Sequence, residues 1–342
     1  MKAAVYYGPE DVRVEELEVP KIQDNEVLVR VRICGVCATD VKTILVGHPM
    51  IKPPTVLGHE IAGEVIDVGK NVTEHRVGDR VVVAPYVPCG ACYYCQHEQH
   101  TLCSRLFERT PTPGGFSQMV KVPSNIVEKG TLLIPADVSY EEAAFTEPLA
   151  CCLHGMEECH IGVGHTVAIV GDGPMGLMHL QLANVAGARK VIMSGRLDER
   201  LNVAKELGAD VIVNETKEDP VKKVTDETEG RGADVVIVAV GSAAAAEQGL
   251  KLVRRGGTVN FFGGFPSGTE FKLDPNLIHY SEVKLTGTFG FSHADFVKSL
   301  QLISKRKVDV KKLITHKFRL DQVLDAVKIS AQLKGLKVLL TI

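Results

Sequence analysis

The sequence predicts an α/β protein of two domains, in which a β-rich domain is joined to a domain with a doubly wound parallel sheet. Its 342 residues are enough for two domains that each bury a core. The first part of the chain contains short apolar or alternating runs separated by Gly, Pro, Asn and Asp, which is typical of antiparallel strands. From about Cys151 onward, strand-like runs alternate with helical patterns, which indicates parallel strands joined by right-handed crossovers.

The composition excludes several classes of partner. A net charge of −3 and a pI near 6.5 give no electrostatic ground for binding nucleic acid or an anionic membrane surface. No apolar run approaches the ~20 residues of a membrane span, and the first ten residues contain no apolar segment of the kind found in signal peptides. We therefore expect a cytoplasmic protein whose partners are small molecules or further copies of the same chain.

The β-rich part carries two turns with chemically useful side chains. The expected strands are Lys2–Tyr6, Val12–Val14, Glu26–Ile33, Gly63–Val68 and Asp79–Ala84. The turn Gly35–Asp40 follows the third of these strands, and Gly58-His59-Glu60 opens a strand that starts at Ile61. Taken alone, Cys37 would be interpreted as a buried thiol and His59 as an ordinary core or surface histidine. Their interest lies in their combination.

Four cysteines form a compact metal-binding pattern. Cys89, Cys92, Cys95 and Cys103 are spaced C-x2-C-x2-C-x7-C within fifteen residues, which is enough to surround one Zn²⁺ with four thiolates and leave no open position. Buried thiols, two disulfides or a nucleic-acid-binding zinc ribbon are the alternatives. A reducing compartment disfavours disulfides, and the neighbouring run Gln96–His100 is not basic. We therefore predict a structural zinc site.

The second part of the chain contains a dinucleotide-binding pattern in its required setting. Thr166–Val170 is predicted as a strand, Gly171-Asp-Gly173-Pro174-Met175-Gly176 follows at once, and an apolar helical pattern runs to Gly187. In such a motif the first glycine permits the tight turn, the second lets the backbone approach the pyrophosphate, and the third lets the helix pack on the strand. The helix N-terminus then faces the phosphates. The alternative is a glycine turn with only a structural role.

Further strands and helices continue this alternation. The expected strands are Lys190–Ser194, Val211–Val213, Ala233–Val240 and Thr258–Phe262. The expected helices are Leu197–Leu207, Asp219–Glu229 and Ala243–Arg254.

The end of the second strand of this domain decides which dinucleotide is preferred. An NAD site places Asp or Glu about 20 residues beyond the motif, but the corresponding residue is Gly195, followed by Arg196. Because a guanidinium pairs well with phosphate, we predict NADP with NAD as the alternative, and candidate cofactor contacts at Ser194, Gly195, Arg196 and Arg200. Asp198 could instead bind the ribose. A Gly195→Asp variant is expected to shift the preference towards NAD.

These motifs together resemble those of the zinc-dependent medium-chain dehydrogenases. Cys37, Gly58-His59-Glu60, the cysteine lobe, Glu147-Pro148 and the glycine motif occur in the order and spacing of that family, closest to its sorbitol (polyol) and threonine dehydrogenase branch. The resemblance covers essentially the whole chain. It implies a GroES-like catalytic domain from residues 1–149 and 289–342, with a structural zinc lobe at about 86–108, and a Rossmann domain at 150–288. It also implies a homodimer or homotetramer, and a return of the last strand, Val338–Ile342, to the first domain.

A catalytic zinc needs three protein ligands and one open position. Cys37 and His59 supply two ligands, and the third is a carboxylate from Glu60 or Glu147. The resemblance implies that both carboxylates lie at the metal and exchange. The alternative for Glu147 is a carboxylate that interacts with a helix N-terminus.

The resemblance also assigns roles to three residues after Cys37. Thr39 would bond the substrate alcohol and pass its proton onward, although a threonine that bonds only backbone is an equal alternative. Asp40 would orient the site from behind. Lys42 stands where many relatives have a histidine, so it would bond the ribose, bind an anionic substrate or remain solvated.

The leading hypothesis is a zinc-dependent, NADP(H)- or NAD(H)-linked dehydrogenase that oxidises a secondary alcohol of a polyol or sugar derivative to a ketone. A threonine 3-dehydrogenase-like activity with NAD is the alternative within enzymes. A non-catalytic zinc and dinucleotide-binding sensor or structural subunit is the alternative outside them. No role is assigned to Cys34, Cys151, Cys152 or Cys159, for which burial is the default interpretation.

Overall fold

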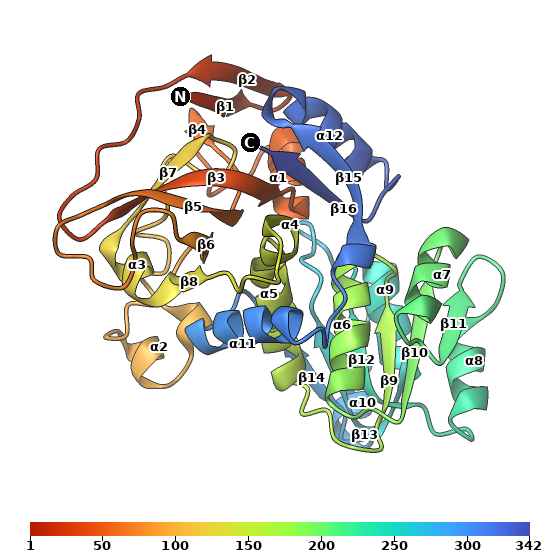
Figure 1. Ribbon diagram of the computed structural model, residues 1–342. Helices are drawn as coiled ribbons and strands as arrows, with labels where there is room; N and C mark the ends of the chain where they lie inside the picture. Colours follow the sequence, from red (N-terminus) through yellow and green to blue (C-terminus); the bar gives the residue numbers. More distant parts are fainter. The chain divides into compact units, whose positions relative to one another are not determined.

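The computed structural model describes residues 1–342 and divides the chain into two compact units. The first unit comprises Met1–Ala150, Phe291–Arg306 and Val310–Ile342. The second comprises Cys151–Gly290 and Lys307–Asp309. The second unit is therefore inserted into the first along the chain, and the expected α/β fold class is confirmed (Figure 1).

Two β-sheets form the framework of the first unit. A three-stranded sheet has the order β2-β1-β4, and a seven-stranded sheet has the order β15-β16-β3-β5-β6-β8, with β7 paired to β3. The strands are β1 (Lys2–Gly8), β2 (Asp11–Glu16), β3 (Val27–Gly35), β4 (Thr55–Val56), β5 (Glu60–Val68), β6 (Arg80–Val83), β7 (Met119–Val122), β8 (Thr131–Leu133), β15 (Ile314–Arg319) and β16 (Lys337–Thr341). The central pair β3 and β5 runs antiparallel.

The strands of this unit form because β-branched residues dominate their buried positions. In β3 the side chains of Val27, Val29 and Val31 are fully buried, and in β5 Ile61 and Val65 join the same core. The unit's helices are α1 (Ala38–Val46), α2 (Tyr93–Gln96), α3 (Ser124–Gly130), α4 (Tyr140–Ala143), α11 (His293–Ser304) and α12 (Val323–Ala331), while α5 (Thr146–Glu157) crosses the boundary between the units.

One local expectation for this unit was wrong. The segment after Gly35 is not only a turn, because helix α1 begins at Ala38. Cys37 is its N-cap, with Sγ accepting from the backbone N–H of Thr39, and Asp40 completes a capping box by accepting from the N–H of Cys37. A thiol is not among the usual capping side chains, so the sequence gives little sign of this helix start.

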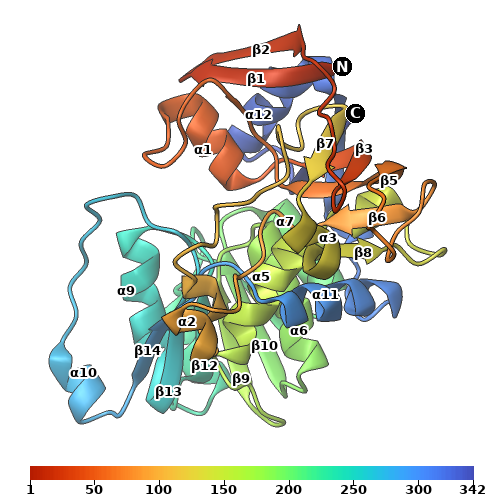
Figure 2. The ribbon, with the colours of Figure 1, turned by 90° about the vertical axis from the view of Figure 1, so that its left-hand side faces the viewer.

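The second unit contains a six-stranded sheet in which every strand pair is parallel. Its order is β11-β10-β9-β12-β13-β14, and Figure 2 shows β9, β12, β13 and β14 side by side. The strands are β9 (Thr166–Val170), β10 (Lys190–Gly195), β11 (Val211–Asn214), β12 (Ala233–Val238), β13 (Val253–Phe261) and β14 (Lys284–Gly287). The helices are α6 (Pro174–Val185), α7 (Asp198–Glu206), α8 (Pro220–Glu227), α9 (Ala243–Leu252) and α10 (Pro275–His279).

The strand order confirms a doubly wound sheet. Strand β9 is buried along its whole length, as expected when helices cover both faces of a parallel sheet. The order of strands reverses between β9 and β12, and the carboxyl ends of strands at such a reversal are where open α/β sheets bind ligands. The loop with the glycine motif begins there, at Gly171.

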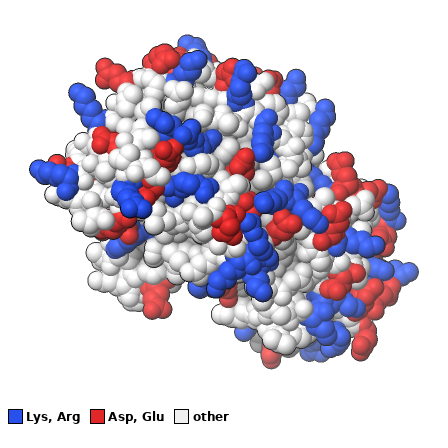
Figure 3. Space-filling model, in the orientation of Figure 1, with Lys and Arg blue, Asp and Glu red and all other residues white.

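The surface carries charges of both signs. On the face shown in Figure 3, Lys and Arg are interspersed with Asp and Glu, in keeping with a net charge of −3. None of the helices combines the length and the apolar character that a crossing of the bilayer would require.

Candidate active site

Three potential metal donors meet in the first unit. One ligand atom each from Cys37, His59 and Glu60 lies within 4.8 Å of the others. Cys37 stands between β3 and α1, while His59 and Glu60 stand at the start of β5. A thiolate, an imidazole and a carboxylate are the three ligand types that zinc accepts. The structure therefore brings together three of the four residues expected at the catalytic ion.

The pairing of β3 with β5 creates the space for the carboxylate. Gly35 lies directly opposite Glu60 in the antiparallel register. A Cβ at position 35 would overlap Oε2 of Glu60. Any other residue at this position would therefore displace the carboxylate from the donor group.

A buried lysine fixes one oxygen of Glu60. Nζ of Lys337, the first residue of β16, donates to Oε1 of Glu60 at 2.5 Å, and the two side chains are only 7% and 1% exposed. Burial is the largest single influence and opposes protonation of Lys337, but the charges of Glu60, Cys37 and Glu147 and the hydrogen bond to Glu60 together outweigh it and raise the pKa of the lysine. Oε2 of Glu60 is buried and has no hydrogen-bond partner, which fits a metal ligand. Sequence reasoning missed Lys337.

Asp40 holds the other two donors in place. Its Oδ2 accepts from the backbone N–H of Cys37 at 3.0 Å, and its Oδ1 accepts from the N–H of Gly58 at 3.3 Å. Oδ1 also lies 3.6 Å from Nδ1 of His59. Burial lowers the pKa of His59, but Asp40 and Cys37 outweigh this effect and raise it well above 6.5. A carboxylate behind a histidine is the usual arrangement that orients a metal-binding ring.

The remaining predicted residues lie around this group. Glu147 is buried in the first turn of α5 and is not among the three donors within 4.8 Å, although its charge contributes to the raised pKa of Lys337. Thr39 is exposed in the first turn of α1, where its backbone N–H donates to Sγ of Cys37 at 3.5 Å. Lys42 is exposed one turn further along α1.

The four-cysteine lobe is preformed in the same unit. The sulfurs of Cys89, Cys92, Cys95 and Cys103 all lie within 4.8 Å of one another, and none of the nine cysteines forms a disulfide. Backbone N–H groups donate to the sulfurs of Cys89 and Cys103 at 3.3 to 3.5 Å. Backbone N–H groups of Cys95 and Ser104 lower the pKa of the Cys92 thiol to about 5. Thiolates held in this way fit one tetrahedral zinc ion.

In the second unit, the three glycines of the motif suit their positions for different structural reasons. Gly171 has a φ of 116°, which other residues rarely adopt. A Cβ on Gly176 would overlap the carbonyl oxygen of Gly171. Gly173 has ordinary extended backbone at the N-cap of α6, and a Cβ there would meet nothing within 4 Å. Open space above Gly173, beside Pro174 and Met175, fits the close approach of a bound pyrophosphate.

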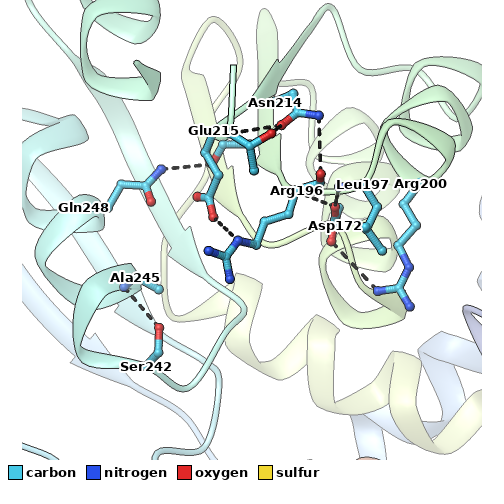
Figure 4. Close-up of polar contacts among 11 residues, drawn as sticks. Asp172, Arg196, Leu197, Arg200, Asn214, Glu215, Ser242, Ala245 and Gln248 are labelled. Carbon is cyan, nitrogen blue, oxygen red and sulfur yellow. Dashed lines mark hydrogen bonds and ion pairs between the residues drawn. The ribbon is translucent and has the colours of Figure 1, made fainter. Parts of the chain in front are cut away.

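The predicted ribose-proximal residues fall into two groups. The hydroxyl of Ser194 is buried, donating to the carbonyl of Ile169 at 3.4 Å, and Arg200 is also buried. Arg196, in contrast, has a side chain that is 75% exposed, and its Nε lies 3.0 Å from Oε1 of Glu215 (Figure 4). Of the two arginines, Arg196 is therefore the one that can meet a ligand.

Asp198 is engaged within the protein. Its carboxylate accepts from the side-chain amide of Asn214 at 2.7 Å and from Nζ of Lys217 at 2.5 Å. These bonds lower the pKa of Asp198. They occupy both oxygens of the carboxylate that was the alternative ribose ligand.

Family models match both units. The model described as alcohol dehydrogenase GroES-like domain matches residues 23–133, and the model described as zinc-binding dehydrogenase matches residues 174–305. Together these matches cover more than half of the chain.

Similar proteins match over nearly the full length. The sorbitol dehydrogenase of Bacillus subtilis (strain 168) is 35% identical over 340 residues, covering 98% of this chain and 95% of that protein. The L-threonine 3-dehydrogenase of Thermococcus kodakarensis is 35% identical over 325 residues, covering 93% and 90%.

A solved structure shares the whole fold. A zinc-binding dehydrogenase from Sinorhizobium meliloti 1021, bound to NADP, superimposes with a TM-score of 0.92 at 32% identity, covering 100% of this chain and 99% of that one. The chain therefore belongs to the zinc-dependent medium-chain dehydrogenases, a family of oxidoreductases that includes alcohol and polyol dehydrogenases.

Proposed function

We propose that this protein is a zinc-dependent, NADP(H)-linked dehydrogenase that oxidises a secondary alcohol of a polyol or sugar derivative to a ketone. The observation that carries the proposal is the convergence of Cys37, His59 and Glu60 on one point. Bound there, zinc would supply a Lewis acid that lowers the pKa of a substrate hydroxyl, while the nicotinamide would accept the hydride.

The side chains around the donor group then have distinct tasks. Cys37, His59 and Oε2 of Glu60 would bind the ion, because one ligand atom of each residue lies within 4.8 Å of the others and this oxygen has no hydrogen-bond partner. Asp40 orients His59 and the backbone of Cys37. We assign to Thr39, exposed beside Cys37, a relay role, in which its hydroxyl accepts the proton of the substrate alcohol while it passes its own proton onward. Glu147, buried in the same unit as Glu60, remains the second candidate carboxylate for the ion.

NADP is the proposed cofactor for two reasons. Gly195 ends β10 without the carboxylate that an NAD site uses, and Arg196 is exposed beside it. The Sinorhizobium meliloti structure bound to NADP supports this preference. Gly171, Gly173 and Gly176 would position the pyrophosphate in either case.

A threonine 3-dehydrogenase-like activity with NAD is the second candidate, and the Thermococcus kodakarensis relative supports it. A panel of sorbitol, xylitol, sugar acids and threonine, assayed with both cofactors on protein of measured zinc content, separates the two candidates. We expect activity with the polyols and NADP. Turnover of threonine alone, with NAD, would contradict the proposal.

Lys42 offers a finer test of the substrate class. Its exposed ammonium on α1 suits a phosphorylated or carboxylated substrate. If it binds such a group, Lys42→Ala should raise the KM for the anionic substrate and leave that for a neutral polyol unchanged. Higher activity on neutral polyols, unaltered in Lys42→Ala, would exclude this role.

The assembly and compartment follow as further parts of the proposal. β14 is the last strand of the second unit's sheet and has no neighbour on its outer side, so it suits pairing with a second copy in a homodimer or homotetramer. Light scattering of the purified protein tests this assembly. Cysteines free of disulfides support a reducing compartment such as the cytoplasm.

A further inference from the structure

The second residue of the glycine motif, Asp172, is bonded to a different element of the second unit. Its Oδ2 accepts from the backbone N–H of Arg196 at 2.8 Å and from that of Leu197 at 2.9 Å (Figure 4). Helix α7 has Leu197 as its N-cap, a residue whose side chain offers no hydrogen bond. Asp172 therefore satisfies the N–H groups just ahead of this helix, as a capping side chain would.

The position of Asp172 explains why residue 195 is a glycine. A Cβ at Gly195 would lie 2.4 Å from Cβ of Asp172 and 2.5 Å from its Cγ and Oδ2, closer than real side chains approach one another. Gly195 does not have a positive φ, so its backbone does not itself demand glycine. The glycine leaves room for the carboxylate of the neighbouring loop.

The carboxylate of Asp172 faces only one of the two arginine side chains, that of Arg200. Oδ1 of Asp172 faces Nη1 of the buried Arg200 at 3.9 Å, so both oxygens of the carboxylate are directed at α7. Figure 4 shows Arg196 pointing the other way, toward Glu215. Arg196 and Glu215 line a cavity of about 440 Å³ together with Thr216, Gln248 and Lys251.

The ion pair of Arg196 is one that a ligand can replace. The Arg196 side chain is 75% exposed and that of Glu215 is 25% exposed, and exposed ion pairs contribute little to stability. A phosphate dianion forms stronger, forked bonds with a guanidinium than a single carboxylate oxygen does at Nε. The exposed guanidinium at the cavity thus suits a phosphate on the 2′-oxygen of an adenosine.

We propose that Asp172 and Gly195 act as a reciprocal pair that sets the dinucleotide preference of this protein. The carboxylate that an NAD site carries at the end of the second strand has no room here, because Asp172 fills that volume from the glycine loop and is bonded by α7. Arg196 is then the charged group left for the ribose 2′ substituent. The inference rests on the proposed dinucleotide site and identifies the residues that make it selective.

The proposed pair leads to an expectation for Gly195→Asp that differs from the one drawn from the sequence. Gly195→Asp alone does not convert the site to NAD, because the new side chain overlaps Asp172 and places two carboxylates against each other. Only the exchange of both residues, Asp172→Gly with Gly195→Asp, moves the carboxylate to the strand end without that conflict, because Asp172→Ala would keep the Cβ that lies 2.4 Å from a Cβ at position 195.

Two measurements on the purified full-length protein test the pair. The first compares Gly195→Ala in the wild-type background and in the Asp172→Gly background, which lacks the opposing Cβ, by urea unfolding. We expect Gly195→Ala to lower the unfolding midpoint clearly in the first background and little in the second. Additive effects, with the same loss in both backgrounds, would overturn the pairing. This measurement needs no ligand and does not depend on the dehydrogenase activity.

The second measurement is calorimetric titration with 2′,5′-ADP and 5′-AMP as probes of the ribose site. Wild type should bind 2′,5′-ADP at least about tenfold more tightly, which corresponds to about 1.4 kcal/mol. The double variant should reverse this order. Gly195→Asp alone should bind both probes more weakly. A clean reversal by Gly195→Asp alone, at wild-type stability, would contradict the proposal.

A control variant separates this inference from the proposed function. Arg196→Ala should lose affinity for 2′,5′-ADP and keep that for 5′-AMP, while Asp172→Asn, which retains an oxygen acceptor for α7, should fold and keep the wild-type order. Equal binding of the two probes by wild type would overturn both the NADP preference and the role of the pair. Absence of alcohol oxidation with intact probe preference would overturn only the proposed reaction.

Discussion

The two donor groups of the first unit are built in opposite ways. The four-cysteine lobe takes all of its sulfurs from one short segment, Cys89 to Cys103, and its neighbouring backbone donates to those sulfurs. The group of Cys37, His59 and Glu60 depends on the pairing of β3 with β5 and on Lys337, 277 residues after Glu60. A local set of four ligands closes round an ion, whereas a set of three from distant segments leaves a position open for chemistry.

The largest expected effect concerns the lobe. If the lobe holds the expected structural zinc, Cys92→Ser should remove this ion and with it a folding contribution on the order of 10 kcal/mol, since structural zinc binding and folding are coupled. Zinc content should fall by one ion per chain, with loss of soluble folded protein measured by circular dichroism. Cys151→Ser, a cysteine outside both groups, is the matched control and should change neither quantity.

The second effect separates catalysis from folding. Cys37→Ser should reduce kcat/KM by about a thousandfold, because several kcal/mol of Lewis-acid stabilisation is lost with the ion. The unfolding midpoint should stay near that of wild type and the lobe should keep its zinc. A Cys37→Ser protein that unfolds as readily as Cys92→Ser would show that the two groups are not different in kind.

Lys337 allows a smaller and more specific test of the open group. In Lys337→Met the buried carboxylate of Glu60 has no counter-charge, which should cost about 3 kcal/mol of stability in zinc-free protein. With zinc present the loss should shrink, because the ion then lies beside the carboxylate. Urea unfolding with and without zinc measures both values.

Lys337→Arg is the control for this test, since it keeps the positive charge. Adding Glu60→Gln to Lys337→Met should recover most of the lost stability. An equal loss in the presence and absence of zinc would mean that Glu60 does not face the ion.

The most gradual effect, small at each step of pH, concerns acid, which could strip zinc and unfold the chain at once. His179 in α6 is fully buried, neither ring nitrogen has a hydrogen-bond partner, and burial lowers its pKa to about 3. The contribution to stability of a histidine whose pKa is lowered by folding is fully present at pH values above its pKa in the unfolded chain, which is near 6.5. That stability is lost as the pH falls below about 6.5 towards 3, by up to about 1.4 kcal/mol per pH unit.

His179→Leu should therefore flatten the dependence of stability on pH below about 6.5. The exposed His279→Gln in the same unit should leave it unchanged. In the His179→Leu background, release of zinc from the two donor groups can be followed at low pH with less interference from unfolding. An unaltered pH slope would show that His179 is not the acid-sensitive group.

Much of the fold followed from local patterns in the sequence. The strand Thr166–Val170 was predicted with the bounds that the structure gives, because a run of β-branched residues before a glycine turn has few alternatives. The strand pairing of the first unit was not predictable in the same way. This pairing places Gly35 opposite Glu60, and its register depends on contacts across the whole sheet.

The site residues that the sequence did not reveal share one physical reason. Lys337 and Asp172 are ordinary charged residues in their own segments, and each acquires its role from a partner on another element. Gly173 could be singled out from the spacing of its motif, whereas Cys37 and His59 could be singled out only from their combination and from the resemblance to the zinc-dependent medium-chain dehydrogenases. The sequence does not show that a position must be glycine because a side chain from another segment fills the adjacent space, as Asp172 does at Gly195.

The placement of Lys337 on β16 has a consequence for the order in which a newly made chain matures. All of the second unit, Cys151–Gly290 and Lys307–Asp309, leaves the ribosome before β16, the strand that carries this ammonium group. Until β16 pairs with β3, Glu60 lacks its ion-pair partner Lys337 and the sheet of the first unit is incomplete. Maturation of the donor group is therefore a late event, set by the arrival of the final strand.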